Sequence, residues 1–447
     1  MNDTIVGLST AVATQAVSII RVSGKESIKI VNNIFKGKDL EKVESHTINY
    51  GHIFYHDKII DEVLVSIMKS PKTYTKEDIV EINSHGGIST TNKIIEILLE
   101  LGCRLAEPGE FTKRAFLNGR IDLIEAEAIN DLINAKTEKN RTLALNNMNG
   151  KLTFKINEIR EELIKIISNI EVNIDYPEYE DINVVTTKKI VDTITKLKSE
   201  LEKLLKDSKD SKLIKNGINV AIIGKPNVGK SSILNHLLEE DKAIVTDIAG
   251  TTRDIVEGQI LINGALINLI DTAGIRETND LVEKIGVKKS LDYIDKSDLV
   301  LIVLNNNEEL SSEDKEIIEQ VSDTKRLIFV NKNDLSNKLH LDYKYVTGNT
   351  INQDGLDNLK NAIIKKFELD NIMEKDISYV SNIRQVNHIK DALNSINSAL
   401  DNINKDISID IIEIDLRSAW ESLGDIIGAN YNEELIDNLF ANFCLGK

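Results

Sequence analysis

Short apolar runs in the first part of the chain alternate with a stretch of helical pattern. Residues 17–22 and 63–68 are short and rich in Val, Ile and Leu, which is typical of strands. Residues 91–101 instead repeat apolar side chains at helical spacing. Because strand-like and helical patterns alternate within a stretch about as long as one domain, we predict an N-terminal α+β domain over residues 1–118.

The pattern then becomes almost wholly helical from about residue 121 to 209, and it is helical again from 383 to 443. Pro177 marks a break between two long helices in the first stretch. The apolar faces of that stretch comprise Leu123, Ala126, Ala128, Ile129, Ile156, Ile159, Leu163, Ile166 and Ile167. A helical region that stops and later resumes predicts one discontinuous all-α domain, residues 119–214 and 371–447.

The interruption, residues 215–370, has a different pattern. It contains apolar runs at 218–223, 266–270 and 327–330, which have the composition of buried strands, and a polar motif follows each run. Sheets of α/β domains bind ligands at the carboxyl ends of their strands. The sequence therefore predicts an α/β domain that is inserted into the helical domain and carries a binding site.

The first motif is the segment 224–231, which reads G-K-P-N-V-G-K-S and leads into a helical pattern at 232–239. A Gly-rich turn between a buried strand and a helix lets successive backbone N–H groups surround a phosphate. In this pattern Lys230 is expected to reach the β- and γ-phosphate oxygens, and the Ser231 hydroxyl is expected to bind Mg²⁺. The motif predicts a P-loop.

The other two motifs are Asp271-Thr272-Ala273-Gly274 and Asn331-Lys332-Asn333-Asp334. Asp271 can hold Mg²⁺ through water, and the Gly274 N–H can sense a γ-phosphate. Asp334 can accept two hydrogen bonds from guanine, whereas adenine presents an acceptor that would leave this carboxylate badly paired. Each motif alone could be a solvated turn, but all three in this order predict a GTP site.

Ile275 follows the second motif, where small signalling GTPases have a Gln that orients the attacking water. Another side chain must then orient the water, and Arg253, Arg276 and Glu283 are the candidates. Thr252 is expected to close onto Mg²⁺ and the γ-phosphate.

Composition limits the class of protein. The 447 residues carry a net charge of -17, which argues against a broadly basic nucleic-acid surface but allows a local one. Cys103 and Cys444 are too few and too far apart for a disulfide framework, so a cytoplasmic location is expected. No stretch approaches the roughly 20 consecutive apolar residues of a membrane span.

Two further features narrow the family. Residues 108–123 read P-G-E-F-T-K-R-A-F-L-N-G-R-I-D-L, and the chain ends in Cys444-Leu445-Gly446-Lys447, a C-x-G-K terminus. Together with G-T-T-R-D at 250–254, these features closely resemble the MnmE (TrmE) family of tRNA modification GTPases over essentially the whole chain. The resemblance implies a Ras-like P-loop GTPase fold for the inserted domain. It also implies modification of the wobble uridine of certain tRNAs at carbon 5, with an aminomethyl or carboxymethylaminomethyl group.

The same resemblance implies cofactors and partners. These are GTP, Mg²⁺, K⁺, a 5-formyl-tetrahydrofolate-type donor, and a homodimer that joins the flavoprotein MnmG (GidA) in a heterotetramer or larger complex. The implied donor contacts are Arg21, Glu81, Arg120 and Lys447. The arginines can pair with carboxylates and Glu81 can accept from pterin N–H groups, although each could equally be a surface ion-pair partner.

Cys444 is implied to be needed for modification, as a nucleophile or as a residue that shapes the site. A lone Cys is usually an inert apolar residue, which is the interpretation we give Cys103. A nearby Lys447 could instead lower the pKa of the Cys444 thiol and favour the thiolate.

For hydrolysis the resemblance implies Glu283 as the water-orienting residue and Lys230 as the phosphate-binding cation. It places K⁺ against Asn227, Thr246, Ile248 and Thr251, where the ion would supply positive charge beside the phosphates. The full set of expected GTP contacts is Asn227, Val228, Gly229, Lys230, Ser231, Ser232, Thr246, Asp247, Ile248, Ala249, Gly250, Thr251, Thr252, Asp271, Thr272, Ala273, Gly274, Asn331, Lys332 and Asp334.

Two departures from the family pattern affect these expectations. Residues 9–16 lack the usual Pro and Gly, and Thr347-Gly348 replaces a Ser-Ala loop near the guanine, where backbone donors could still serve. The alternative function is a ribosome-assembly or regulatory GTPase switch without modification activity. A third possibility is that the protein has lost modification activity and keeps only GTP hydrolysis. The presence of Arg21, Arg120 and Cys444 argues against this possibility.

Overall fold

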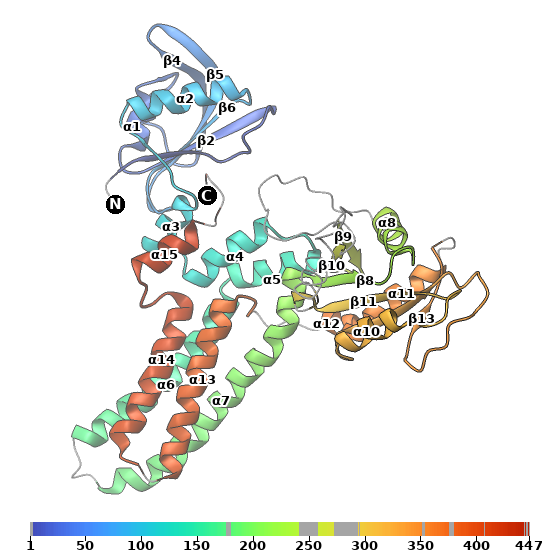
Figure 1. Ribbon diagram of the computed structural model, residues 1–447. Helices are drawn as coiled ribbons and strands as arrows, with labels where there is room; N and C mark the ends of the chain where they lie inside the picture. Colours follow the sequence, from blue (N-terminus) through green and yellow to red (C-terminus); the bar gives the residue numbers. More distant parts are fainter. Residues whose placement is uncertain are drawn as a thin grey trace, which may run out of the picture. The chain divides into compact units, whose positions relative to one another are not determined.

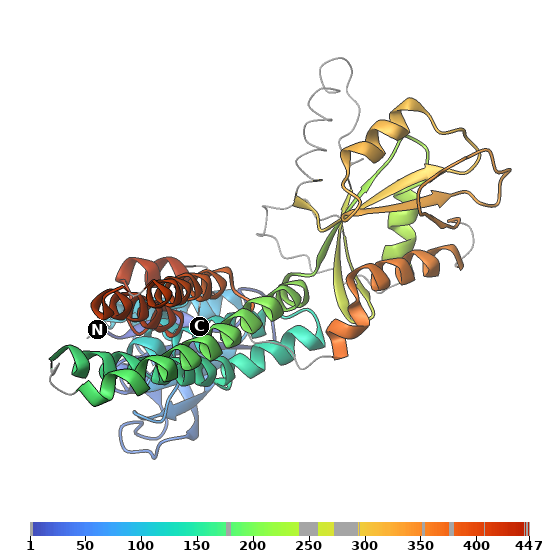
Figure 2. The ribbon, with the colours of Figure 1, turned by 90° about the horizontal axis from the view of Figure 1, so that it is seen from below.

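The computed structural model describes residues 3–175, 180–240, 258–271, 294, 296–350, 354–374, 380–405, 407–441, 443 and 446. The chain divides into two compact units. The first contains Met1–Ile133, Asn146–Lys198 and Asn387–Lys447, and the second contains Asn134–Leu145 and Ser199–Val386. Figures 1 and 2 show the elements of both units from two directions.

The first unit begins with a seven-stranded sheet in the order β3-β4-β5-β6-β2-β1-β7. All neighbours pair antiparallel except β1 and β7. The strands are β1 (Ile5–Leu8), β2 (Val17–Ser23), β3 (Phe35–Lys36), β4 (Thr47–Tyr55), β5 (Lys58–Met68), β6 (Ile79–His85) and β7 (Arg104–Leu105). Helices α1 (Ser27–Asn32) and α2 (Ile88–Glu100) pack on one face and share its apolar core. The predicted α+β fold is confirmed.

The other face of this sheet is open. Side chains alternate between the faces along each strand, so Val63 and Val65 are buried in the core while Leu64 is exposed. The register places Tyr50 opposite Leu64 and Ile48 opposite Ser66, and Ser66 in turn lies opposite Glu81. Arg21 is the partner of Glu81 on β2, so these polar residues share the open face with an apolar patch.

The helical part of the first unit is built around α6 (Lys151–Asp175) and α14 (Ile409–Ile427), which pack along each other (Figure 1). The predicted apolar face of α6 is buried at Ile156, Ile159, Leu163, Ile166 and Ile167. The other helices are α3 (Glu110–Leu117), α4 (Leu123–Ile133), α5 (Glu138–Met148), α7 (Glu180–Asn216), α13 (Ile383–Asn404) and α15 (Glu433–Phe440), of which α5, α7 and α13 are shared with the second unit. Pro177 lies outside the described residues.

The second unit contains a six-stranded sheet in the order β13-β12-β11-β8-β10-β9. Only the β9 and β10 pair is antiparallel among the described strands. The strands are β8 (Ile218–Ile223), β9 (Gly258–Ile262), β10 (Ala265–Asp271), β11 (Leu299–Asn305), β12 (Arg326–Asn331) and β13 (Val346–Thr347). The three predicted buried strands therefore correspond to β8, β10 and β12.

Helices cover both faces of this second sheet (Figure 2). One core joins the sheet to α8 (Lys230–Glu240) and α11 (Asp354–Phe367), and another joins it to α10 (Ser312–Gln320). The short helix α12 (Leu369–Glu374) follows α11. A mostly parallel sheet between two helical layers, with a Gly-rich turn after its first strand, is the predicted P-loop α/β fold.

Candidate functional site

The Gly-rich turn connects β8 to α8 and has a shape that depends on glycine. Gly229 has a φ of +102°, and a Cβ placed on it would lie 2.2 Å from Asn331 Nδ2. Asn227, with φ +63°, also adopts the left-handed region, which Asn tolerates better than most residues. The turn therefore holds a conformation in which its backbone N–H groups can face a phosphate.

Lys230 lies over this turn. Its Nζ donates hydrogen bonds to the carbonyls of Gly224 at 2.7 Å and Lys225 at 2.8 Å. Two backbone carbonyls thus orient the ammonium group at the start of α8, where phosphate oxygens are expected. Ser231, the predicted Mg²⁺ ligand, is exposed at the same helix end.

The base-recognition motif is joined to the phosphate turn by two hydrogen bonds. Asn331 Nδ2 donates to Val228 O at 2.8 Å, and Lys332 Nζ donates to Asn227 O at 2.9 Å. Asn331 Oδ1 is buried without a hydrogen-bond partner, so a polar ligand here would satisfy it. Asp334 is exposed and makes no hydrogen bond within the described part of the chain, which leaves its carboxylate available to a base.

The departure at Thr347-Gly348 has a packing cause. A Cβ on Gly348 would lie 2.7 Å from both Gly355 and Phe329, so the usual Ala does not fit. The Gly348 N–H donates to Val330 O at 3.0 Å, so this backbone donor is already engaged. Asn349 Nδ2 donates to Asn333 Oδ1 at 2.8 Å, which ties this loop to the base-recognition motif.

Several predicted residues lie outside the described residues: Thr246, Asp247, Ile248, Ala249, Gly250, Thr251, Thr252, Arg253, Thr272, Ala273, Gly274, Ile275, Arg276, Glu283, Cys444 and Lys447. Asp271 ends β10, and only its backbone is described. Asp271 pairs in parallel register with Ile222, so it ends its strand beside the strand that leads into the phosphate turn. The roles predicted for these residues stay predictions.

A second group of predicted residues meets on the open face of the first sheet. Arg21 Nη2 lies 2.8 Å from Glu81 Oε1, and both side chains are partly exposed. The Arg21 guanidinium lies 5.7 Å from the centre of the Tyr74 ring, and the Arg120 guanidinium lies 4.7 Å from the same ring. Arg21 and Arg120, two of the four residues predicted to contact the one-carbon donor, therefore lie over Tyr74, and Glu81 joins them through Arg21. Tyr74 carried no sequence signal because it lies alone in a loop.

The C-terminal tail reaches this group. Gly446 O accepts hydrogen bonds of 3.2 Å from Arg21 Nη1 and from Ser9 Oγ. Gly446 has a φ of +86°, and a Cβ on it would lie 2.1 Å from Leu8 O. The Gly of the C-x-G-K terminus is thus required by close approach to β1, while Cys444 and Lys447 on either side of it are not described.

The unusual 9–16 loop borders the same site and is held by side chains. Gln15 Nε2 donates to Ala11 O at 3.1 Å and to Ser18 Oγ at 3.2 Å. Thr10 Oγ1 accepts from the Ile19 N–H at 3.3 Å. Side-chain hydrogen bonds therefore help to hold this loop, whose residues lack the Pro and Gly that are usual at these positions in the family.

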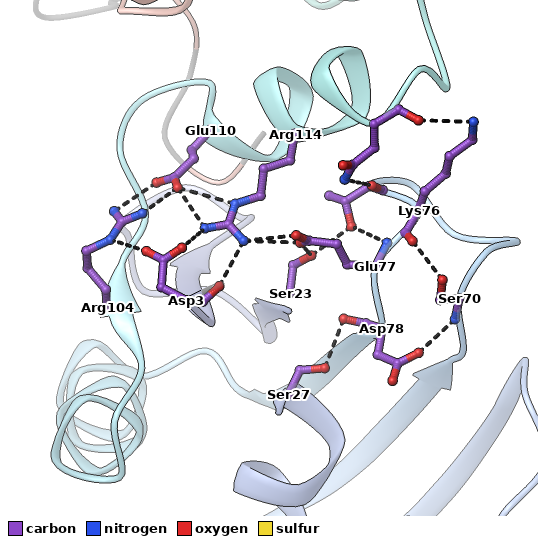
Figure 3. Close-up of polar contacts among 12 residues, drawn as sticks. Asp3, Ser23, Ser27, Ser70, Lys76, Glu77, Asp78, Arg104, Glu110 and Arg114 are labelled. Atoms are coloured by element: carbon purple, nitrogen blue, oxygen red, sulfur yellow. Dashed lines mark hydrogen bonds and ion pairs between the residues drawn. The ribbon is translucent and has the colours of Figure 1, made fainter. Parts of the chain in front are cut away.

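The 108–123 motif takes part in an ion network that is centred on the buried Arg114 (Figure 3). Arg114 is 1% exposed, and its guanidinium donates to Asp3, Glu77 and Glu110. Burial raises the pKa of Glu110, but hydrogen bonds and charge from Arg104 and Arg114 outweigh burial and hold that pKa below its usual range. The network joins the N-terminal strand to α3, which explains why this motif combines Glu and Arg four residues apart.

Cys103 is buried in the core of the first sheet, and burial raises the pKa of its thiol to about 11. This burial agrees with the interpretation of Cys103 as an apolar core residue. The helices of the described residues include none with the length and apolar character of a membrane span.

Comparison with known proteins covers the whole chain. The family model described as the MnmE helical domain matches residues 123–444, and the model described as the GTP-binding protein TrmE N-terminus matches residues 4–120. The tRNA modification GTPase MnmE of Bacillus cytotoxicus is 49% identical and aligns with 100% of this chain and 99% of its own length. The protein of the same name from Ligilactobacillus salivarius is 47% identical and aligns with 100% of this chain and 98% of its own. A solved structure, the G domain of the T. maritima FeoB iron transporter, is 29% identical over 34% of this chain and 98% of that chain, with a TM-score of 0.25.

Proposed function

The chain belongs to the MnmE family of tRNA modification GTPases, and from this premise we propose that it is a potassium-activated GTP hydrolase that modifies the wobble uridine of tRNAs at carbon 5. It is a GTP hydrolase that acts in tRNA modification, and it uses GTP with Mg²⁺. The finer proposal adds the flavoprotein MnmG as partner, in a heterotetramer or larger complex in the cytoplasm. It also adds a 5-formyl-tetrahydrofolate-type donor, which supplies the one-carbon unit.

The observation that supports this proposal is the meeting of Arg21, Glu81 and the C-terminal tail at one place on the sheet. A folate has carboxylates at one end and a pterin with N–H donors at the other. Because Arg21 and Glu81 are paired at 2.8 Å, both face the same part of the donor, where Arg21 and Arg120 can donate to its oxygens and Glu81 can accept from pterin N–H groups. The chemistry of the side chains therefore fits the donor, and Lys447 at the end of the tail is the fourth proposed contact.

In the modification reaction the residues of the chain hold and orient the donor. Arg21 is shared among Glu81, Gly446 O and the donor, so binding of a carboxylate exchanges one ionic partner for another instead of burying a lone charge. Gly446, in the same C-terminal segment as Cys444, lies at this site. We propose that the Cys444 thiol is required there, with Lys447 favouring its thiolate.

In GTP hydrolysis Lys230 binds the β- and γ-phosphates and Ser231 and Thr252 bind Mg²⁺. The Asn227 side chain is exposed and makes no hydrogen bond within the described residues, while its carbonyl is fixed by Lys332. That side chain is free to coordinate K⁺ beside the phosphates. Glu283 orients the attacking water, because Ile275 cannot.

We also propose a homodimer through the open face of the first sheet. Ile48, Tyr50 and Leu64 are 69%, 62% and 47% exposed and lie in adjoining rows of that face. An apolar patch next to a polar site is the usual mark of an interface. The proposed donor residues lie at its border, so the second copy would help to enclose the donor.

Calorimetric titration of the purified chain with 5-formyl-tetrahydrofolate tests the donor site. The wild-type chain is expected to bind, and Arg21→Met is expected to abolish binding. Arg141→Met is the matched control, because Arg141 is exposed and pairs only with its helix neighbour Glu138 in the described structure. Absence of binding by the wild-type chain, or equal binding by Arg21→Met, contradicts the proposed site.

A further inference from the structure

Lys225, the second residue of the phosphate turn, directs its side chain toward α10. Its Nζ lies 2.8 Å from Asp314 Oδ2, 3.1 Å from Ser311 Oγ and 3.6 Å from Glu308 Oε2. The side chains of Lys225 and Asp314 are 17% and 4% exposed, so this ion pair is largely shielded from water. Such a pair has a defined geometry, unlike an exposed ion pair.

The acceptors of Lys225 are themselves fixed. Ser311 and Asp314 form a capping box at the start of α10, in which each side chain accepts a hydrogen bond from the backbone N–H of the other. Ser311 Oγ also donates to Asp314 Oδ2 at 2.7 Å. The lysine is therefore anchored to a rigid helix end, and the hydrogen bond to Asp314 raises the pKa of Lys225 and keeps it charged.

The backbone of Lys225 has a different partner. Its carbonyl, with that of Gly224, accepts the hydrogen bonds from Lys230 Nζ. The later part of the turn is fixed by Asn331 and Lys332, whose side chains bind Val228 O and Asn227 O. Lys225 fixes the earlier part, so that both ends of the turn are tied to neighbouring elements.

We propose that Lys225 is a positioning residue for GTP hydrolysis, which ties the phosphate turn to Asp314 so that the Gly224 and Lys225 carbonyls hold Lys230 in place. This inference rests on the GTPase site alone and does not depend on the donor or on tRNA. Lys230→Ala tests the assignment of the GTPase site separately, because this variant should lose hydrolysis whether or not Lys225 is a positioning residue.

Substitution of Lys225 alone also leaves the buried Asp314 carboxylate without its cation, which destabilises the fold. The double variant Lys225→Met/Asp314→Asn removes both charges and keeps a side chain that can serve the capping box. Lys225→Arg keeps a cation that can reach Asp314. Lys315→Met is the matched control, because Lys315 is exposed on α10 and makes no ion pair among the described residues.

The measurements are the melting temperature, the affinity for GTP and the kcat of GTP hydrolysis for each variant. We expect the double variant to regain most of the melting temperature that Lys225→Met loses, yet to hydrolyse GTP at least about tenfold more slowly than the wild type, as a displaced catalytic group does. We expect Lys225→Arg and Lys315→Met to stay near the wild-type kcat. Recovery of both melting temperature and kcat in the double variant, or an unchanged kcat in Lys225→Met, overturns the proposal.

Discussion

Arg21 and Gly446 lie 425 residues apart in the sequence, and a hydrogen bond of 3.2 Å from Arg21 Nη1 to Gly446 O joins them. Arg21 also pairs with Glu81 through a separate nitrogen at 2.8 Å. One guanidinium thus connects the strand pair β2 and β6 to the C-terminal tail. Displacement of the tail is therefore expected to change the position of the Arg21 guanidinium and its affinity for a ligand at this face.

Gly446→Ala is expected to displace the tail, because its φ of +86° disfavours Ala and the added Cβ would lie 2.1 Å from Leu8 O. We expect loss of wobble-uridine modification with GTP hydrolysis nearly unchanged, measured by nucleoside analysis and phosphate release. Gly102→Ala is the control, because Gly102 has a φ of +101° but no atom within 4 Å of an added Cβ. Equal modification by the two variants is incompatible with a positioning role for the tail.

Glu110→Gln should lower the free energy of unfolding by about 2 kcal/mol at neutral pH, because it removes one of the three carboxylates that pair with the buried Arg114. The folded pKa of Glu110 is depressed, so its contribution exists above the usual Glu pKa and is lost as pH falls through the lower folded value. The free energies of unfolding of the wild-type and Glu110→Gln chains, measured with urea between pH 7 and pH 3, should therefore converge as the pH falls. Glu96→Gln, at an exposed pair with Lys93, serves as control. A gap that persists in acid contradicts the ionic explanation.

Asp334→Asn should weaken GTP binding by about 2 to 3 kcal/mol and shift preference toward xanthine nucleotides, because an amide replaces the acceptor of two guanine hydrogen bonds. The fold should be unaffected, since Asp334 is exposed and makes no hydrogen bond in the described residues. Competition binding with GTP and xanthosine triphosphate measures the change. An unaltered GTP affinity indicates that the base is recognised elsewhere.

Hydrolysis should be faster in KCl than in NaCl at equal ionic strength, because the exposed Asn227 side chain is suited to a monovalent ion and Ile275 cannot orient water. The measurement is the turnover of GTP in each salt. Asn227→Ala should remove the difference between the salts. Equal rates for the wild-type chain in the two salts count against the potassium site.

The strands and helices that follow strong apolar patterns were predictable from the sequence, as β8 at Ile218–Ile223 illustrates. The resemblance implied only that Arg21 and Glu81 contact the same one-carbon donor, and their pairing was not predicted, because the register of β2 with β6 decides it. The contacts of Lys225 with Ser311 and of Tyr74 with Arg120 were not predictable. These contacts join loops from distant parts of the chain, and no spacing in the sequence encodes them.

We propose that this chain is required for modification of the wobble uridine at carbon 5. Mass spectrometry of tRNA nucleosides from a strain that lacks the gene, complemented with the wild-type chain, Cys444→Ser or Lys230→Ala, tests it most directly. We predict that only the wild-type chain restores the modified uridine, and that purified Cys444→Ser still hydrolyses GTP while Lys230→Ala does not. Identical nucleosides with and without the gene would contradict the function, and full modification by Cys444→Ser would contradict the role of the thiol.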